Sequence, residues 1–123
     1  MNQNLRKGLR FEDRARRYLA ERGLELLEAN YRCRLGEIDL IMRDGDTLCF
    51  IEVRYRKSLD FGGASASITP AKQRRIVKAA LFYLSTLAQN PWRRALRFDA
   101  LLIQQQPGGG LDFNWIRNAF SAE

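Results

Sequence analysis

The sequence predicts an α/β fold in which a mixed β-sheet is flanked by two main helices. Two stretches repeat apolar residues at the three- and four-residue spacing of a helix, and runs of strand-forming residues lie between them and after the second. One of these runs, Arg97–Ile103, is almost continuously apolar, which is typical of a strand covered on both faces. With 46% hydrophobic residues in a chain of 123, there is enough apolar material for one domain with a real core, spanning residues 1–123.

The first predicted helix runs from about Asn4 to Arg22, and Gly23 ends it. On a helical wheel, Glu12 falls inside the apolar stripe, where an acid is out of place. The simplest explanation is a glutamate at the edge of the stripe that pairs with Arg16 one turn later, which stabilises a helix by a few tenths of a kcal/mol. The pattern alone leaves open whether Glu12 has this role or a functional one.

A strand is predicted over Leu24–Tyr31, and residues 32–36 link it to a β-hairpin. The hairpin is formed by two strand-like runs, 36–42 and 47–57. Between them lies Asp44-Gly45, a strong short-range signal for a tight turn between antiparallel strands. We therefore expect a pair of antiparallel strands here, apolar enough to be central in the sheet.

Charged side chains interrupt this apolar hairpin. Because side chains alternate along a strand, Asp39 faces away from its apolar neighbours, and Glu52 and Arg54 share one face of the second run. Folding the hairpin can bring all three to one surface. Charge is costly there, because an ion withdrawn from water is destabilising unless it is paired or bound to a metal. The opposite faces hold Ile38, Leu40 and Met42 in the first run and Ile51, Val53 and Tyr55 in the second.

The second predicted helix starts at Thr69-Pro70, with threonine as the N-cap, and ends at about Gln89 before Asn90-Pro91. Its apolar stripe, extended towards the N-terminus, places Lys72 and Gln73 on the same face. A lysine in the first turn opposes the helix dipole at a cost of about 0.3–1 kcal/mol. This indicates that an anion lies nearby, either the acidic residues of the hairpin or a phosphate, which helix N-terminal amides also bind.

Two strands follow this helix, Arg97–Ile103 and Leu111–Phe120. Asp99, near the start of the first, is expected to be a structural partner for a nearby arginine. Trp115 in the second is expected to cover the edge of the core.

The chain is basic, with 21 lysine and arginine residues against 14 acidic ones and a net charge of +7. This balance favours nucleic acid as a partner, with an anionic membrane as a weaker alternative and a generic basic surface as the simplest explanation. Two arginines, Arg32 and Arg34, have a second explanation, because they can balance the charge of Glu37. The residues expected to contact phosphates are Arg32, Arg34, Arg56, Gln73, Arg74 and Arg75.

Several classes of chemistry are excluded by composition. The sequence has no histidine, which excludes serine–histidine and cysteine–histidine catalysis. Cys33 and Cys49 do not form a close ligand pair, so we do not expect a zinc site.

There is no visible secretory leader and no apolar run long enough to span a bilayer, so we expect a cytoplasmic protein without membrane contact.

The motif Gly36-Glu37-Ile38-Asp39-Leu40-Ile41, followed by Phe50-Ile51-Glu52-Val53-Arg54, resembles the signature of the YraN-like uncharacterised bacterial proteins. The resemblance covers nearly the whole chain. That family is similar in turn to the restriction-endonuclease-like, or PD-(D/E)xK, nucleases, which include archaeal Holliday junction resolvases. The resemblance implies one restriction-endonuclease-like domain with the order α-β-β-β-α-β.

The resemblance also implies a site for Mg²⁺ or Mn²⁺. In the resembled nucleases an aspartate on one strand and a glutamate on the next bind the metal, and these positions match Asp39 and Glu52. Many resolvase-like nucleases add a first-helix glutamate, which matches Glu12. Carboxylates suit such a hard cation, which would activate a water for attack on phosphorus.

The lysine that the resembled nucleases carry two residues after the glutamate is replaced here by Arg54. Arginine can hold a phosphate in a bidentate manner but stays protonated near neutral pH, so it cannot act as a general base. Lys57 is turned away by strand alternation. Lys72 is the more plausible substitute, because such nucleases sometimes supply their lysine from the following helix; activation of water by the metal without a lysine is the other route.

Three hypotheses follow. The first is a metal-dependent DNA endonuclease, with branched or structured DNA as one substrate class. The second is a nucleic-acid-binding module of the same fold without cleavage, in which the acids form cross-strand ion pairs. The third is a scaffold that binds another protein. Related nucleases often form homodimers, but nothing in this sequence marks an interface.

Overall fold

The computed structural model describes residues 3–57, 68–87 and 95–122, and within these residues it confirms the predicted α/β class. The order of elements is α-β-β-β-α-β-β, which adds the last predicted strand to the order of the resembled fold. The elements are α1 (Gln3–Ala20), β1 (Glu25–Cys33), β2 (Gly36–Asp44), β3 (Thr47–Arg56), α2 (Pro70–Ser85), β4 (Ala95–Gln105) and β5 (Leu111–Phe120).

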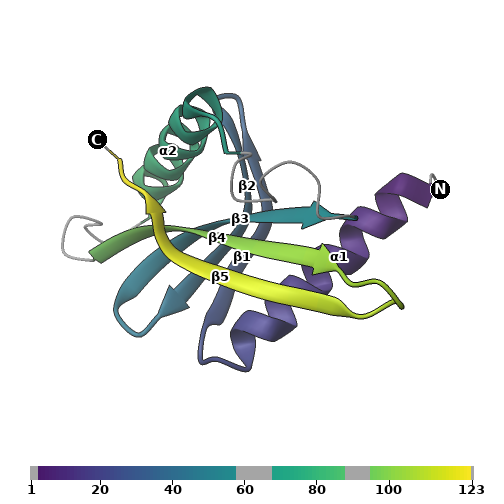
Figure 1. Cartoon of the computed structure of the whole chain (residues 1–123). Coiled ribbons are helices and arrows are strands. Elements are labelled where there is room, and N and C mark those ends of the chain that lie inside the picture. Colours follow the sequence, from purple (N-terminus) through teal and green to yellow (C-terminus); the bar gives the residue numbers. More distant parts are fainter. Residues whose placement is uncertain (1–2, 58–67, 88–94, 123) are drawn as a thin grey trace.

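The strands of the described residues form one mixed five-stranded sheet in the order β1-β2-β3-β4-β5. Neighbouring strands are antiparallel except β3 and β4, which are parallel and are connected through α2. A parallel pair needs such a crossover, since a tight turn joins only antiparallel strands. The two helices lie on opposite sides of the sheet (Figure 1), so each face is covered by one helix.

Each face of the sheet has its own core. Residues of α1 such as Ala15 and Leu19 pack on one face, and residues of α2 such as Ile76 and Leu84 pack on the other. The central strands supply both cores because their side chains alternate between the faces. The α1 core contains Leu40, Met42, Cys49, Ile51, Leu101 and Ile103 of the sheet, and the α2 core contains Ile38, Ile41, Leu48, Phe50 and Phe98.

The predicted position of Ile38 is wrong. Strict alternation places it with Leu40 and Met42 on the α1 face, but Ile38 packs in the α2 core beside Ile41. The reason is that β2 pairs with β3 only as far as Leu40, and before that residue it follows β1 alone. Strand twist then turns this end of β2 towards α2.

Strands β1, β2 and β3 form two hairpins, of which the sequence predicted one. The turn after Asp44 is as predicted, with Gly45 in the left-handed region at a φ of 60°. The predicted link over residues 32–36 is wrong, because Arg32 and Cys33 belong to β1 and Gly36 to β2. Only Arg34 and Leu35 remain as the turn, and β1 and β2 form a second tight hairpin.

Helix α2 begins as predicted, with the Thr69 hydroxyl accepting the amide of Lys72 at 3.1 Å. It ends earlier than the predicted Gln89. The amide and the hydroxyl of Thr86 both donate to the carbonyl of Tyr83, and this pattern closes the last turn. No helix in the described part of the chain is long and apolar enough to cross a membrane.

Candidate functional site

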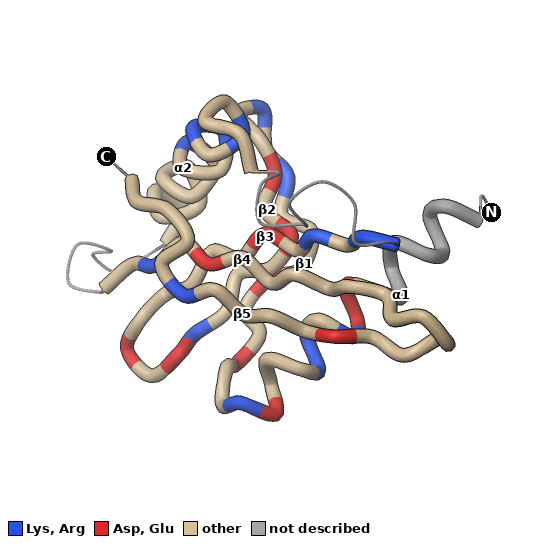
Figure 2. Tube along the Cα trace, in the orientation of Figure 1, with Lys and Arg blue, Asp and Glu red and all other residues tan. Residues whose placement is uncertain are grey.

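Asp39 and Glu52 lie next to each other at the point where β2 and β3 separate. The antiparallel ladder ends with the pair Leu40 and Ile51, and the next residue along each strand is one of the two acids. The amide of Val53 donates to Asp39 Oδ2 at 2.8 Å, so the aspartate takes the place of the missing ladder partner. Figure 2 shows acidic positions of β2 and β3 near the middle of the sheet. The structure thus brings the two predicted strand acids together.

The Asp39 carboxyl is held in its neutral form by its surroundings. Burial, then the hydrogen bond and the charge of Glu52, raise the pKa of Asp39 from 3.8 to about 8. The Val53 amide and the Lys72 ammonium act in the opposite direction but are outweighed. Two carboxyls this close resist ionising together, and one retains a proton unless a cation neutralises them.

Lys72 joins this pair from the other side of the site. Its Nζ lies 3.2 Å from Glu52 Oε2, and the Glu52 side chain is only 7% exposed. The first turn of α2 therefore delivers a cation to the acids of the hairpin, as the unfavourable position of Lys72 in the helix dipole predicted. Of the two anions considered for this lysine, the hairpin acid is the one in contact.

Glu12 approaches the same region from α1. Burial and the charge of Asp39 raise the pKa of Glu12, whereas Asn30 and Arg32 lower it. Its Oε2 is buried and has no hydrogen-bond partner among the described residues. Within these residues, no three acidic or cysteine side chains are close enough to hold one metal ion. The predicted three carboxyls are therefore a close pair with a third nearby.

The end of β3 carries the remaining predicted groups. Arg54 lies two residues after Glu52 and is partly buried, and Arg56 donates from Nη1 to the carbonyl of Tyr55 at 3.0 Å. Lys57 lines a different pocket together with Tyr55 on the α1 side, as strand alternation predicted. It is therefore not a replacement for the missing strand lysine.

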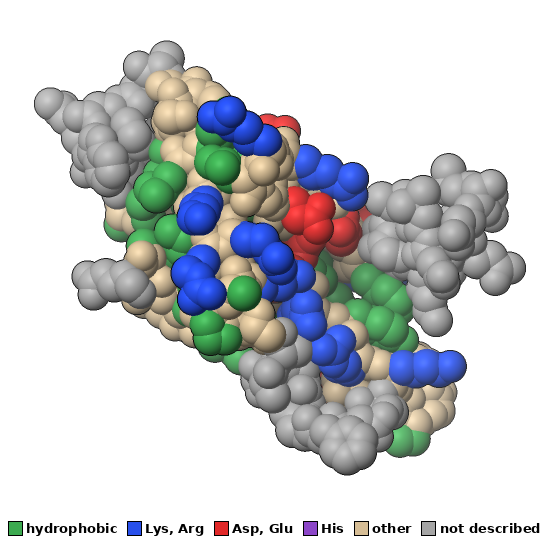
Figure 3. Space-filling model, turned by 90° about the horizontal axis from the view of Figure 1, so that it is seen from above, with side chains coloured by type: hydrophobic (Ala, Val, Ile, Leu, Met, Phe, Trp, Pro, Cys, Tyr) green, Lys and Arg blue, Asp and Glu red, His purple; other side chains and the backbone are tan. Residues whose placement is uncertain are grey.

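The predicted phosphate-contacting residues other than Arg56 lie in three different surroundings. The side chain of Gln73 already has a partner, since its Nε2 donates to the backbone carbonyl of Ile68 at 3.1 Å. Arg32, Arg34 and Arg75 line a pocket of about 420 Å³ that Lys72 also lines. Arg74 is exposed on α2. In Figure 3, lysine and arginine side chains gather beside a cluster of acidic ones.

The sequence patterns did not single out Asn30, and they gave Glu37 only as a charge that Arg32 and Arg34 could balance. Asn30 hydrogen-bonds Glu12 and has a φ of 54°, where β1 passes Asp39. An asparagine within a strand was the available signal, because asparagine is depleted in strands but tolerates positive φ. Glu37 lines the pocket of Arg32, Arg34, Lys72 and Arg75, here called the basic pocket. It pairs with Arg32 at 3.4 Å, as the charge-balancing explanation for this arginine predicted. Its proximity to Lys72 and Arg75 depends on how the hairpin packs on α2, which no local pattern encodes.

Comparison with known proteins identifies one family. The model of the family described as "Uncharacterised protein family UPF0102" matches residues 11–103. A UPF0102 protein of Nitrosospira multiformis is 52% identical over 114 residues, which cover 93% of this chain and 92% of that protein. One of Psychromonas ingrahamii is 53% identical over 93% of this chain and 88% of its own length. One of Chromohalobacter salexigens is 50% identical over 98% and 95%, respectively.

Proposed function

The chain belongs to the uncharacterised protein family UPF0102, and from that premise we propose that it binds nucleic acid and hydrolyses DNA phosphodiester bonds as a Mg²⁺- or Mn²⁺-dependent endonuclease. One observation carries the proposal. Asp39 and Glu52 meet inside the sheet, and Lys72 contacts Glu52. The pKa of Asp39 is raised to about 8, so its carboxyl keeps a proton at pH values well above its ordinary pKa. Strongly shifted carboxyls beside a basic surface are typical of functional sites.

The residues present fit a small divalent cation. Mg²⁺ and Mn²⁺ prefer carboxylate oxygens, and Mg²⁺ is commonly bound through one or two carboxylates while it keeps several waters. Asp39 and Glu52 would hold the cation, and Glu12, whose Oε2 has no partner in the described chain, would lie near it without being a third ligand. When bound, the cation would supply an activated water and stabilise negative charge on the phosphate oxygens.

The side chains of the protein would position the substrate. Lys72, with its Nζ already at the rim of the acidic pair, would donate to a phosphate oxygen or hold the attacking water. Lys72 on α2 would supply the amine that β3 lacks, because Arg54 occupies the position two residues after Glu52 where the resembled nucleases carry lysine. The fork of N–H donors on Arg54 suits a phosphate oxygen, and its permanent charge restricts it to binding rather than proton transfer.

Basic residues around the acids favour nucleic acid over an uncharged substrate. Lys72, Arg32 and Arg75 line one pocket next to the acidic pair, and the whole chain carries a net charge of +7. Phosphate neutralisation by such residues supplies most of the affinity of sequence-independent nucleic-acid binding.

The test is a titration of the purified protein with Mg²⁺ or Mn²⁺ on supercoiled plasmid, branched DNA and single-stranded DNA. We expect nicking that needs the metal, that EDTA stops, and that falls at least about a hundredfold in Asp39→Asn and in Glu52→Gln. Glu28→Gln, which removes an exposed acid from β1, is the matched control and keeps activity. Metal-dependent nicking that survives in both site variants would contradict the proposal, as would no nicking with either metal.

A second candidate is favoured by the arginine at the strand position. If Arg54 cannot replace the lysine, the chain is a nucleic-acid-binding module without cleavage, and the Lys72–Glu52 contact is a structural ion pair. Salt-dependent binding of DNA without nicking, unchanged by Asp39→Asn, would identify this second function.

A further inference from the structure

The basic pocket lies between the β1–β2 hairpin and α2, and the two elements approach closely. A Cβ atom at Gly36 would lie 2.7 Å from the carbonyl oxygen of Arg75, closer than such atoms come in proteins. The end of the hairpin is therefore seated directly on the helix. This contact fixes one wall of a pocket of about 420 Å³ against the other.

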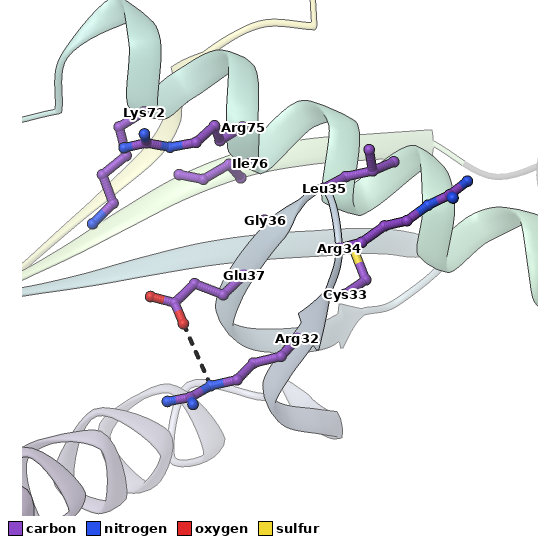
Figure 4. Close-up of a pocket in the computed structure, with 9 residues that line it drawn as sticks. All are labelled: Arg32, Cys33, Arg34, Leu35, Gly36, Glu37, Lys72, Arg75 and Ile76. Atoms are coloured by element: carbon purple, nitrogen blue, oxygen red, sulfur yellow. Dashed lines mark ion pairs between the residues drawn. The ribbon is translucent and has the colours of Figure 1, made fainter.

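Three cations from two elements surround one carboxylate in this pocket. In Figure 4, the side chains of Lys72 and Arg75 extend from α2 and that of Arg32 extends from β1 towards the side on which Glu37 lies. The side chain of Arg34, which lines the same pocket, points the other way. Position in the sequence does not separate Arg34 from Arg32, but orientation in the structure does.

The three cations differ in the partners that they contact. Lys72 contacts Glu52 of the acidic pair, and Arg32 contacts Glu37. The side chain of Arg75 makes no hydrogen bond or ion pair with any residue that the structure describes. The Arg32–Glu37 pair is weak, because its N–O distance is 3.4 Å and the two side chains are 76% and 62% exposed. An anion that binds Arg32 more strongly can therefore displace Glu37.

We propose that this pocket binds a backbone phosphate of the nucleic-acid strand adjacent to the scissile phosphate, and that Glu37 holds Arg32 in place until that phosphate arrives. The inference rests on the proposed function, because it takes the bound strand as the ligand. Lys72 lines the pocket and also contacts Glu52. A phosphate in the pocket would therefore lie next to the scissile phosphate at Asp39 and Glu52. Arg32 and Arg75 would hold it with charge-assisted hydrogen bonds.

The chemistry of the pocket indicates which part of the strand is recognised. Among the described residues that line it, the charged side chains are cations and one carboxylate, and none carries an aromatic ring on which a base could stack. Contacts to phosphates fix the position of a strand but carry no sequence information. The pocket would therefore contribute affinity that is equal for different sequences.

The test measures binding of fluorescein-labelled DNA to the full chain by anisotropy, in EDTA so that no cleavage occurs. Arg75→Gln is expected to weaken binding roughly five- to tenfold for two unrelated sequences alike, and to reduce the slope of log K against log salt by about 1. Glu37→Gln is expected to tighten binding several-fold, because it removes a negative charge and releases Arg32. Arg22→Gln, which removes an exposed cation just after α1 and outside the pocket, is the matched control and should change affinity by less than about twofold.

The outcomes separate this inference from the nuclease proposal. If Arg75→Gln binds like the wild type, or if Glu37→Gln binds more weakly, the pocket is not a phosphate site, whether or not the protein cleaves DNA. If the variants behave as expected but no metal supports nicking, the nuclease proposal fails and the pocket remains. Inorganic phosphate at matched ionic strength should not displace the DNA; displacement would identify a site for free phosphate and overturn the inference.

Discussion

Two sets of acidic side chains are withdrawn from solvent in the same sheet, Asp99 in one and Asp39 with Glu52 in the other. The two sets differ in the partners that their carboxyls have. Asp99 is fully buried, and both of its oxygens share the one N–H of Arg97 Nε in a bifurcated hydrogen bond, at 2.9 and 3.1 Å. It also accepts from the indole of Trp115 at 3.0 Å and from the amide of Asn118 at 3.1 Å. Arg97 also bonds Asp44 at 3.0 Å. The fold itself satisfies this carboxylate.

Asp39 and Glu52, in contrast, face each other. Their contacts include the Val53 amide and the Lys72 ammonium, and these do not prevent the pKa of Asp39 from rising to about 8. A carboxylate that the fold neutralises has a structural role. A pair of carboxyls that the fold brings together without neutralising both is typical of functional sites, and this contrast supports the proposed cation site.

The largest expected effect tests the structural side of this comparison. Asp99→Asn leaves the Arg97 guanidinium, whose side chain is only 15% exposed, without its closest carboxylate. Removal of one partner from a buried ion pair costs about 3–5 kcal/mol, and we expect a loss in the lower part of this range because Asp44 remains. Urea unfolding followed by circular dichroism measures it.

Asp39→Asn is the paired variant for this measurement. At neutral pH it should leave the free energy of unfolding unchanged or raise it, because it replaces a carboxyl that is costly to ionise. Equal destabilisation by the two substitutions would remove the distinction between the two acidic sets.

The next effect concerns the cation. Mn²⁺ or Mg²⁺ should stabilise the wild-type protein by about 2.7 kcal/mol when the free metal is a hundred times its Kd. Asp99→Asn should retain this increment on its lower baseline, whereas Asp39→Asn and Glu52→Gln should lose most of it. Thermal unfolding with and without metal measures the increment, and an equal shift in all four proteins would indicate binding elsewhere.

The sequence predicted the parts of this molecule that depend on local patterns. Apolar spacing predicted both helices and the strands, Thr69-Pro70 predicted the start of α2, and Leu111–Phe120 was predicted to the residue. The role of Asp99 as a partner for an arginine is confirmed. Strand alternation predicted the meeting of Asp39 and Glu52, because both face the same side of a hairpin whose turn the sequence also specifies.

The parts that failed depend on contacts between distant segments. Ile38 changes face because β2 leaves β3 and follows β1, and strand alternation within β2 does not include this event. The early end of α2 is the exception, because it depends on a local cap at Thr86 that was not recognised. The basic pocket exists because Gly36 permits the hairpin to approach Arg75, and the spacing of these residues along the chain does not predict that approach.

Measured over one pH unit, the smallest expected effect is the pH dependence of stability. The pKa of Asp39 is raised in the folded protein from 3.8 to about 8, so between these values the folded chain holds a proton that the unfolded chain has lost. The free energy of unfolding therefore decreases as the pH rises through this window, by at most about 1.4 kcal/mol per pH unit for one proton. Glu12, whose pKa is also raised, contributes in the same direction.

Asp39→Asn should flatten this dependence, because the amide does not titrate, and the two proteins should differ most near the upper end of the window. Saturating Mn²⁺ should flatten it in the wild type for a related reason: a cation at Asp39 and Glu52 replaces the proton that the folded state would otherwise keep. Urea midpoints at several pH values between 4 and 8 supply the comparison. Parallel curves for the wild type and Asp39→Asn would mean that the pair is already neutralised by groups of the protein, as Asp99 is, and the contrast between the two acidic sets would disappear.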